Sequence, residues 1–352
     1  MELIKVLNKF DKSKIKAGDG RKDGIYPLYT CSPKVNKFLD DYLYDTEAII
    51  LSTGGNPVIN YHKGRFSYSS DCLVVQSNGK FKNKYIYYYL ISKINEIGKM
   101  FRGAGLKHLN KKEFFKMNIE LINIEEQKKI IKELDLINKL MDYKRKQIKL
   151  FDDFIKSQFV EMFDNKNYPK IRLKEVLVQD PNVEKVENTK LERFITVGIN
   201  GKGARERIIK DEKWPVPFVG YRVKGGQFIY SRIDARNGAF AIIPNYLNNA
   251  VVSKDFPIFD IDYNKIKPDI LLFSLLEESF IDIIKNSSFG ATNRQRIKEG
   301  TFLNYKIYLP PITIQNEFSE IVKQIDKQKF EIEKSLKETQ ELYESLMEKY
   351  FG

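Results

Sequence analysis

Two basic loops carry the side chains with the clearest potential for chemistry. One runs from Arg102 to Lys111, and the other runs from Gly290 to Arg296. Arg and Lys can pair with guanine edges and Asn and Gln with adenine edges, so these loops hold the side chains that major-groove recognition needs. Neighbouring Lys, Ser and Thr side chains could hold phosphates without reading sequence. The competing interpretation is a solvated basic loop with a structural role.

The predicted DNA contacts are polar and basic side chains from these loops and from other turns. In the first half of the chain they are Arg65, Arg102, Lys107, His108, Asn110 and Lys111. In the second half they are Arg222, Arg232, Arg236, Asn237, Thr292, Asn293, Arg294, Gln295 and Arg296. The residues of the two main loops are the best supported candidates for DNA contact, because these loops occupy equivalent places in the two halves.

Catalytic chemistry finds little support in the residue types. No Gly-rich phosphate loop ends in Gly-Lys-Ser or Gly-Lys-Thr, which argues against an ordinary ATPase site. His62 and His108 are the only histidines, too few for a His-rich metal cluster or a general-base constellation. Cys31 and Cys72 are best explained as buried thiols. We therefore expect a chain that is not an enzyme, has no metal site and binds no cofactor itself.

The chain repeats itself at about half its length, which indicates a tandem duplication. A segment that starts at Gly103 resembles one that starts at Gly290. The matched pairs are Phe114 with Phe302, Ile119 with Ile307, Leu121 with Leu309, Gln127 with Gln315, Ile137 with Ile325, and Phe163 with Phe351. Earlier in each half, Asp71 and Asp255 both open a short apolar run. Each half is expected to follow the order basic loop, short alternating strand, turn and long helix.

The long helices are predicted over Glu125–Phe163 and Gln315–Phe351. Both segments lack Gly and Pro, and their apolar residues follow the alternating spacing of four and three that is typical of a coiled-coil seam. Lys144 and Gln158 interrupt the first seam. At 1.5 Å per residue each helix is about 55–60 Å long. Helices of that length need a partner, and the connectivity favours an antiparallel pair.

The remaining segments predict two β-rich modules. The β-rich runs are Ala48–Ser52, Ser67–Val75, Phe228–Ser231, Ala239–Ile243 and Val251–Ile261, and helical spacing covers Tyr85–Gly98 and Asp269–Lys285. The predicted fold class is α+β, with two β-rich modules separated by a long antiparallel two-helix coiled coil and a pseudo-two-fold internal repeat. The expected domains are 1–122 (first module), 123–168 (first helix), 169–311 (second module) and 312–352 (second helix).

Charge follows the same division. The 60 Lys and Arg exceed the 47 Asp and Glu, for a net charge of +13. Residues 1–122 carry 21 basic against 12 acidic side chains and residues 170–311 carry 23 against 17, whereas both helical segments are close to neutral or acidic. A basic excess confined to the modules is expected for a polyanionic partner. The few cysteines, and the lack of an apolar run of roughly 18 residues, predict a cytoplasmic location without membrane contact.

With these features assembled, the chain resembles the specificity subunits of type I restriction-modification systems. The likeness lies in YPLYTCS at 26–32, ILSTGGN at 50–56, FIYSRIDARNGA at 228–239, AVVSKDFPIF at 250–259, GATNRQRI at 290–297 and LPP at 309–311. Two departures stand out. The first half opens with a Lys-rich start where the second has IRLKEVL at 171–177, and Ile122-Asn123 stands where the second half has Pro310-Pro311.

The resemblance implies a function and a set of partners. Each module would be a target-recognition domain that reads one half of a bipartite site in double-stranded DNA. The helices would dock two methyltransferase subunits, and restriction or translocase subunits would complete the complex. S-adenosylmethionine, ATP and Mg would be used by those partner subunits.

Two alternatives stay open. The chain could serve a related type II system in which one partner polypeptide carries both methyltransferase and nuclease. It could also be a non-catalytic coiled-coil scaffold whose basic ends bind nucleic acid non-specifically. A scaffold should bind random duplexes equally well, whereas a specificity subunit should select one bipartite site.

Overall fold

The computed structural model describes residues 1–163, 168–180, 182–287 and 296–352. Contacts divide the chain into two compact units. Unit 1 comprises Met1–Lys146 with Ile332–Gly352, and unit 2 comprises Gln147–Glu331. Because each unit includes part of each long helix, the domain boundaries expected after residues 122, 168 and 311 stay predictions.

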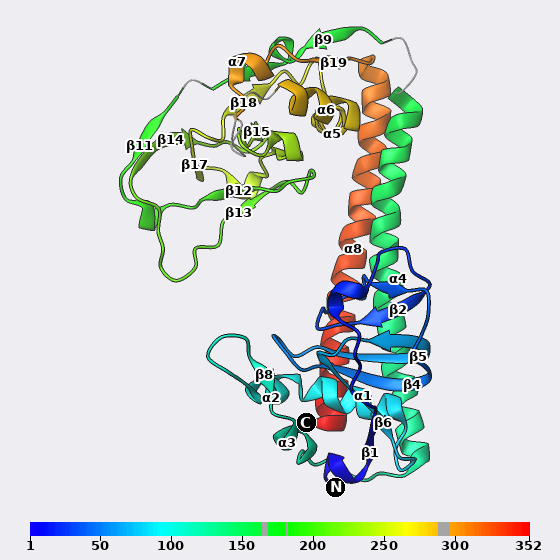
Figure 1. Ribbon diagram of the computed structural model, residues 1–352. Helices are drawn as coiled ribbons and strands as arrows, with labels where there is room; N and C mark the ends of the chain where they lie inside the picture. The colour runs from blue at the N-terminus through cyan, green and yellow to red at the C-terminus, as the bar shows by residue number, and fades with distance from the viewer. Residues whose placement is uncertain (164–167, 181, 288–295) are drawn as a thin grey trace. The chain divides into compact units, whose positions relative to one another are not determined.

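Two long helices, α4 (Ile124–Phe163) and α8 (Ile312–Phe351), contribute to both units (Figure 1). These bounds confirm the two helices predicted from the seam. Seam residues buried in unit 1 are Ile130, Leu134, Ile137 and Met141, and those buried in unit 2 are Ile155, Phe318 and Ile325. Leu342 was also expected in the seam, but it is 51% exposed, and Met347 is buried instead. Within the described residues, no helix is long and apolar enough to span a membrane.

Side-chain contacts within each unit show that α4 and α8 run antiparallel. In unit 1, Lys144 interrupts the apolar seam as a polar layer. Its Nζ donates to the Ser335 carbonyl at 3.0 Å, to the Ser335 hydroxyl at 2.8 Å and to the Thr339 hydroxyl at 2.7 Å. In unit 2, Lys329 Nζ lies 2.6 Å from Asp152 Oδ1. A polar residue in a seam that meets matching acceptors favours one register over others.

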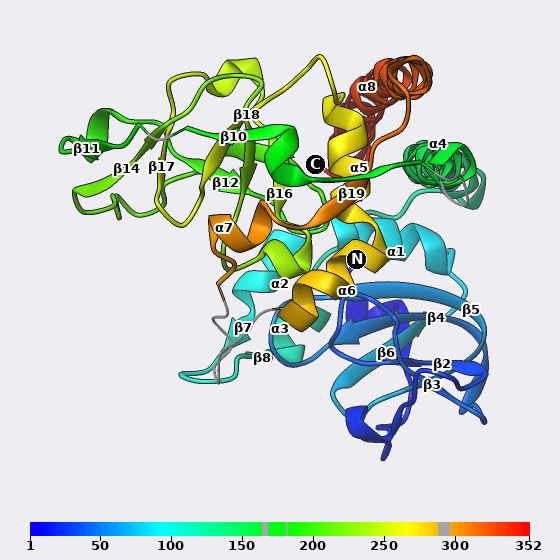
Figure 2. The ribbon, with the colours of Figure 1, turned by 90° about the horizontal axis from the view of Figure 1, so that it is seen from above.

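The main sheet of unit 1 has the strand order β1-β6-β4-β5-β2-β3, and Figure 2 labels each of these strands except β1. The strands are β1 (Leu7–Lys9), β2 (Tyr26–Tyr29), β3 (Phe38–Leu39), β4 (Tyr44–Ser52), β5 (Ile59–Tyr68) and β6 (Cys72–Ser77). All neighbours pair antiparallel except β2 and β5, which pair parallel. The predicted run Ser67–Val75 therefore contains a turn between β5 and β6.

Helices cover the rest of the unit 1 core. They are α1 (Asn83–Ser92), α2 (Ile94–Lys99) and α3 (Lys111–Phe115), with a short β7–β8 ribbon (Phe101–Arg102 and His108–Leu109) before α3. The predicted helix Tyr85–Gly98 is thus divided at Lys93. Phe114 of α3 is fully buried in the cluster that contains the α4 seam. The core consequently joins the β-rich module to the helices.

Unit 2 contains a four-stranded sheet with the order β10-β18-β15-β16, of which Figure 2 labels β10, β18 and β16. Its strands are β10 (Leu177–Gln179), β15 (Phe228–Tyr230), β16 (Phe240–Ile242) and β18 (Ile258–Ile261). A second sheet joins β11 (Glu184–Val186), β14 (Phe218–Arg222) and β17 (Val251–Ser253), and β12 (Ile195–Val197) pairs with β13 (Ala204–Glu206). The helices are α5 (Pro268–Leu276), α6 (Glu278–Ser287) and α7 (Glu299–Phe302), and β9 (Lys170–Arg172) pairs with β19 (Lys306–Tyr308).

The two units share one topology, which confirms the predicted repeat and α+β class. The order β1-β6-β4-β5 in unit 1 corresponds to β10-β18-β15-β16 in unit 2, and every pair is antiparallel. The short strand predicted before each long helix exists only in unit 2, as β19. In unit 1 the matching segment forms a single bridge between Glu2 and Asn118.

The expectation of a divergent start in the first half is wrong. A 3-10 turn, η1 (Leu3–Lys5), precedes β1, as η3 (Leu173–Glu175) precedes β10. Buried apolar residues occupy the same three places, Leu3, Val6 and Leu7 in unit 1 and Leu173, Val176 and Leu177 in unit 2. The apolar spacing was present in the sequence, but the surrounding lysines obscured it.

A buried glutamine locks the start of each long helix to its module. Gln127 Oε1 accepts the Lys82 N–H at 2.8 Å, and its Nε2 donates to the Ile122 carbonyl at 3.0 Å. In unit 2, Gln315 accepts the Lys267 N–H at 2.8 Å and donates to the Pro310 carbonyl at 2.9 Å. Both side chains are completely buried.

The turns before the two glutamines were expected to differ, because only the second contains prolines. The same backbone bond forms in both, since Gln127 N donates to the Asn123 carbonyl and Gln315 N donates to the Pro311 carbonyl, each at 3.1 Å. The Asn123 side chain also accepts the Glu126 N–H at 2.9 Å and so caps α4. The sequence difference changes the cap but leaves this backbone bond in place.

Candidate nucleic-acid interface

In unit 1, backbone hydrogen bonds hold the basic loop 103–107 against the end of β4. Thr53, just after β4, accepts the Leu109 N–H at 3.0 Å and donates its own N–H to the Asp71 carbonyl at 2.8 Å. Gly55 N donates to the Lys107 carbonyl at 2.9 Å. The loop itself is exposed between β7 and β8 (Figure 1). A strand end, a turn and a basic loop therefore meet at one surface.

In its described residues, unit 2 repeats two of these backbone bonds with different side chains. Arg232 stands in the place of Thr53, since it accepts the Ile297 N–H at 3.0 Å and donates its N–H to the Asp255 carbonyl at 2.9 Å. Arg296 Nη2 also donates to Asp255 Oδ2 at 3.1 Å. The pairing of Asp71 with Asp255, seen in the sequence, thus reflects one shared structural position.

A groove borders the unit 1 loop. It is lined by Cys31, Pro33, Gly54, Gly55, Asn56, Pro57, Val58, Asp71, Leu106 and His108. Gly54 forms a bridge with His108, and a side chain at Gly54 would meet the His108 ring at about 3.6 Å. Gly103 adopts a φ of +146°, and a Cβ there would lie 2.9 Å from the Leu106 carbonyl oxygen. Glycine is required at position 103 for the loop to turn back.

The predicted residues of the unit 1 loop take different roles. Lys107 and His108 are exposed at the loop, and Lys111 is exposed at the start of α3. Arg102 donates to Glu113 at 2.5 Å on the exposed surface. Asn110 caps α3, because its Oδ1 accepts the Lys112 and Glu113 N–H groups at 3.2 and 3.3 Å. Lys107 and His108 are the members of this set best placed to reach a ligand.

Arg65 lies apart from this loop. It pairs with Asp45 in the β4–β5 register, seven residues from the strand end at Ser52, which corresponds to roughly 23 Å along a strand. Its Nε donates to Asp45 at 3.1 Å, and its guanidinium lies 4.9 Å from the Tyr42 ring centroid. Hydrogen bonds to the Tyr26 hydroxyl and to Asp45 raise the pKa of Arg65. The side chain is a half-exposed cation on an aromatic platform.

The structure argues against base contact by Arg222. Its guanidinium donates to both carboxylates of Glu184 and Glu192 and to the Asn249 carbonyl, at distances of 2.5 to 3.1 Å. These bonds engage every nitrogen of the side chain, because Arg has five N–H donors. Their combined effect raises the pKa of Arg222. Arg222 lies in β14 and thereby links this strand to Glu184 of β11 and to the loop residues Glu192 and Asn249.

The other unit 2 predictions are divided. Arg232 forms a half-buried ion pair with Glu299. Arg236 and Asn237 lie in a 3-10 turn, η5 (Ala235–Asn237), and Asn237 is exposed. Arg296 is exposed and faces Asp255. Thr292, Asn293, Arg294 and Gln295 lie outside the described residues.

The sequence reasoning missed the β12–β13 hairpin. Its Gly-rich turn docks on η5, because Asn200 N donates to the Asn237 carbonyl at 2.7 Å and Gly201 N donates to the Gly238 carbonyl at 2.9 Å. Lys202 and Arg205 of this hairpin are exposed. The signal was the GINGKGARER segment at 198–207, in which turn glycines alternate with cations. These cations extend the basic surface beside Asn237.

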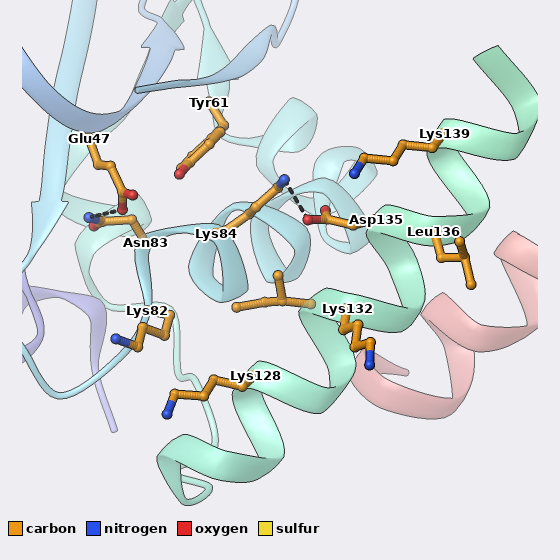
Figure 3. Close-up of a pocket in the computed structure, with 11 residues that line it drawn as sticks. Glu47, Tyr61, Lys82, Asn83, Lys84, Lys128, Lys132, Asp135, Leu136 and Lys139 are labelled. Atoms are coloured by element: carbon orange, nitrogen blue, oxygen red, sulfur yellow. Dashed lines mark hydrogen bonds and ion pairs between the residues drawn. The ribbon is translucent and has the colours of Figure 1, made fainter. Parts of the chain in front are cut away.

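A second pocket of unit 1 lies between the β4–β5 hairpin, α1 and α4 (Figure 3). It is lined by Glu47, Tyr61, Lys82, Asn83, Lys84, Lys128, Ile131, Lys132, Asp135, Leu136 and Lys139. Lys84 Nζ lies 2.7 Å from Asp135 Oδ2, and the Tyr88 hydroxyl donates to Asp135 Oδ1 at 2.6 Å. Burial, followed by the charge of Glu47, raises the pKa of Tyr61 to about 12. These contacts tie α1 to α4.

Little in the described part of the chain suggests catalysis. Among those residues, no cluster of three His, Cys, Asp or Glu side chains could hold a metal ion. His62 Nδ1 lies 2.9 Å from the Tyr29 hydroxyl, and burial lowers the pKa of this histidine. Burial raises the pKa of the Cys72 thiol to about 12. The exposed polar side chains of the candidate interface are instead cations and amides, such as Lys107 and Asn237.

Comparisons with known proteins agree with this description. Residues 1–150 and 194–342 match the profile of the type I restriction modification DNA specificity domain. The type I restriction enzyme MjaVIII specificity subunit of Methanocaldococcus jannaschii is 24% identical over 371 residues, which cover 92% of this chain and 86% of the relative. The EcoDI specificity subunit of Escherichia coli is 26% identical over 131 residues, 37% of this chain and 29% of that protein.

A solved structure supports the fold. The crystal structure of the type I restriction-modification system S subunit from M. genitalium aligns with a TM-score of 0.61 at 15% identity, covering 100% of this chain and 95% of that one. The family profile covers most of the chain and matches both halves. The chain therefore belongs to the specificity subunits of type I restriction-modification systems, a family of non-catalytic components of those complexes.

Proposed function

We propose that this chain binds double-stranded DNA sequence-specifically and that each unit reads one half of a bipartite target. The observation that carries the proposal is a pair of backbone bonds that recurs at the end of one strand in each unit. Thr53 and Arg232 occupy one position, and Asp71 and Asp255 occupy another, with the same backbone bonds in both units. Duplicated scaffolds with different side chains at equivalent places suit the reading of two different short sequences.

The proposed contacts fall into two groups. In unit 1, Lys107 and His108 are the reading candidates, and Lys111 is a candidate phosphate contact. In unit 2, Arg296 and Asn237 are reading candidates, together with Thr292, Asn293, Arg294 and Gln295 of the undescribed loop. The hairpin residues Lys202 and Arg205 join this set. Arg and Lys suit guanine edges, Asn and Gln suit adenine edges, and exposed Lys suits phosphates.

The partners follow from the family. We propose that the long helices dock two methyltransferase subunits and that restriction or translocase subunits join the assembly. S-adenosylmethionine, ATP and Mg belong to those subunits in this proposal, and this chain contributes DNA selection. A type II system with a fused methyltransferase-nuclease would use the same DNA-reading chain, so the identity of the purified partner separates the two.

Base-resolution methylation mapping tests the proposal. DNA would be taken from cells that express the chain with its methyltransferase, and from cells that express His108→Ala or Arg296→Ala variants. Each change should relax recognition in one half of the motif, because a lost reading residue costs roughly 1–3 kcal/mol at its own half-site. Lys63→Ala is the control, since Lys63 is an exposed cation of unit 1 that lies in β5 and pairs with Glu47.

The possible outcomes are distinct. One bipartite motif that disappears when the chain is deleted supports the proposal. Methylation that is unchanged by deletion, with the methyltransferase active, would refute it and favour the scaffold. Relaxation in the same half by both His108→Ala and Arg296→Ala would contradict the assignment of one half-site to each unit.

A further inference from the structure

Two aspartates occupy the same backbone position in the two units but differ in the partners of their side chains. The Asp71 carbonyl accepts the Thr53 N–H at 2.8 Å, and the Asp255 carbonyl accepts the Arg232 N–H at 2.9 Å. These bonds hold both aspartates beside the end of a strand. Because the backbone contact is the same, the two carboxylates can be compared through their surroundings alone.

In unit 2 the carboxylate is paired with a cation. Arg296 Nη2 donates to Asp255 Oδ2 at 3.1 Å, yet the Arg296 side chain is 55% exposed. A guanidinium has five N–H donors in one plane, so a single contact with a carboxylate does not use all of them. Asp255 can therefore orient Arg296 and still leave donors of the guanidinium for a ligand.

Unit 1 has a histidine in the place of this arginine. The N–H groups of Leu109 and Ile297 make matching bonds at the two strand ends, both of 3.0 Å. The residues just before them, His108 and Arg296, are therefore equivalent. The His108 ring lies against Gly54, where a Cβ would meet it at 3.6 Å. Among the described residues of unit 1, no counterpart of the unit 2 ion pair forms.

The Asp71 side chain is consequently an unpaired acid beside the basic loop 103–107. Asp71 is exposed and lines the groove that borders this loop, and among the described residues none donates to its carboxylate. A carboxylate near DNA repels phosphates, so it weakens binding to every duplex unless it contacts a base. In the major groove, Asp accepts from the amino group of cytosine, whereas adenine presents an acceptor beside its amino group. The carboxylate therefore matches cytosine.

We propose that Asp71 is a specificity-determining residue that accepts a hydrogen bond from the amino group of a cytosine in the unit 1 half-site. By the same comparison, Asp255 is a positioning residue that directs Arg296 toward a guanine in the unit 2 half-site. This inference deepens the proposed function and rests on it. One backbone position reads a base directly in one unit and orients the reading residue in the other. Each half-site accordingly contains a G·C pair where this position reaches the duplex.

Base-resolution methylation mapping of Asp71→Asn in the full-length chain, expressed with its methyltransferase, tests the cytosine contact. The substitution keeps the backbone bond to Thr53 but replaces the carboxylate with an amide, which suits the N6 and N7 atoms of adenine. At one position of one half-site, the preference for cytosine over adenine should fall about tenfold or more. The other positions should stay unchanged. Asp41→Asn is the control, since Asp41 is an exposed acid of unit 1 beside Tyr42.

Duplex binding by Asp71→Ala separates a base contact from a solvated carboxylate. Loss of the negative charge should strengthen binding to random duplexes about twofold or more, because phosphate repulsion is removed. If the carboxylate reads cytosine, discrimination at that one position should fall about tenfold in the same variant. Stronger binding to all duplexes with unchanged discrimination at every position would overturn the assignment of Asp71.

The positioning role of Asp255 has its own test. Asp255→Ala should lower the discrimination for guanine about tenfold at one position of the other half-site. Asp255→Glu should restore part of that discrimination, because a carboxylate can again hold Arg296. Asp255→Ala should cause little further loss in a chain that already carries Arg296→Ala, since the two residues act as a unit. A loss spread over the whole half-site, without rescue by Asp255→Glu, would show a merely structural role.

The outcomes for this inference differ from those for the function. A wild-type motif with a half-site that lacks any G·C pair, or an unchanged cytosine preference in Asp71→Asn, would overturn the inference and leave the proposed function intact. The lack of any bipartite motif, with the methyltransferase active, would refute the proposed function itself.

Discussion

Substitution of the buried Gln127 at the start of α4 measures how much the hydrogen bonds between this helix and its module stabilise unit 1. In Gln127→Ala, the Lys82 N–H and the Ile122 carbonyl lose bonds of 2.8 and 3.0 Å at a site with no exposed surface. An unsatisfied buried polar group costs about 1–3 kcal/mol. With two such groups, we expect the free energy of unfolding of unit 1 to fall by about 2–6 kcal/mol.

Urea unfolding with two probes can locate the effect. The single tryptophan is Trp214, in unit 2, so its fluorescence reports on that unit, whereas circular dichroism reports on both. Gln127→Ala should shift the circular dichroism transition and speed amide exchange around residues 80–92. Gln315→Ala is the matched variant, and it should instead shift the Trp214 transition and speed exchange around residues 265–276.

Gln127→Glu sharpens the test through pH. The substitution keeps the shape and the acceptor, but it places a carboxylate against the Ile122 carbonyl. Burial disfavours the charged form, so the folded pKa should exceed the unfolded value of about 4.3. Stability is then lost as pH rises from the unfolded pKa through the folded pKa, and this variant should be less destabilised at pH 5 than at pH 8. A loss below about 0.5 kcal/mol in Gln127→Ala, or an exchange change spread evenly over both units, would refute the reasoning.

Three further predictions follow from the described contacts. Arg222→Ala should lower the unfolding free energy by about 1–3 kcal/mol, because it leaves two glutamates unpaired, yet leave the methylated motif unchanged in sequencing. Cys72 should resist thiol reagents at pH 8, since burial raises its pKa to about 12. Cys31 lines the groove beside the basic loop, so it should react with the same reagents and be protected by cognate DNA. Equal labelling of both thiols would contradict the assignment of Cys31 to an accessible groove. Burial raises the pKa of Tyr85 and of Tyr89 to about 12. Their neutral forms are favoured in the folded state, so stability should be unaffected below the usual tyrosine pKa of about 10 and fall as pH rises from 10 to 12, measured by circular dichroism with tyrosine absorbance.

Features with a local cause were predictable. The seam of α4 repeats along one continuous helix without Gly or Pro, so periodicity alone located the helix to within one residue at Ile124–Phe163. The repeat was equally visible, because Gln127 and Gln315 are the same residue with the same buried role. The match of Leu3 with Leu173 is also present in the sequence, but a pattern of only three apolar residues over five positions is too short to indicate a strand start by itself.

The candidate site was predicted less completely. Arg222 has the residue type of a DNA contact, but Glu184 and Glu192 come to its side only when β14 pairs with β11. Arg65 and His108 both belong to unit 1, yet strand pairing places Arg65 at the far end of the β4–β5 hairpin. The position of Lys202 beside Asn237 depends on backbone bonds between its hairpin turn and η5, which residue types alone do not indicate.

The amino-acid sequence by itself determined the two long helices, the duplication, the basic character of the modules and the family. Each of these depends on composition, or on a period measured along one segment. The tertiary structure decided which cations remain available to a ligand and which are neutralised by carboxylates distant in sequence. It also decided which apolar side chains of α4 are buried, such as Leu134, and which are exposed, such as Leu136, because burial depends on what packs against a helix.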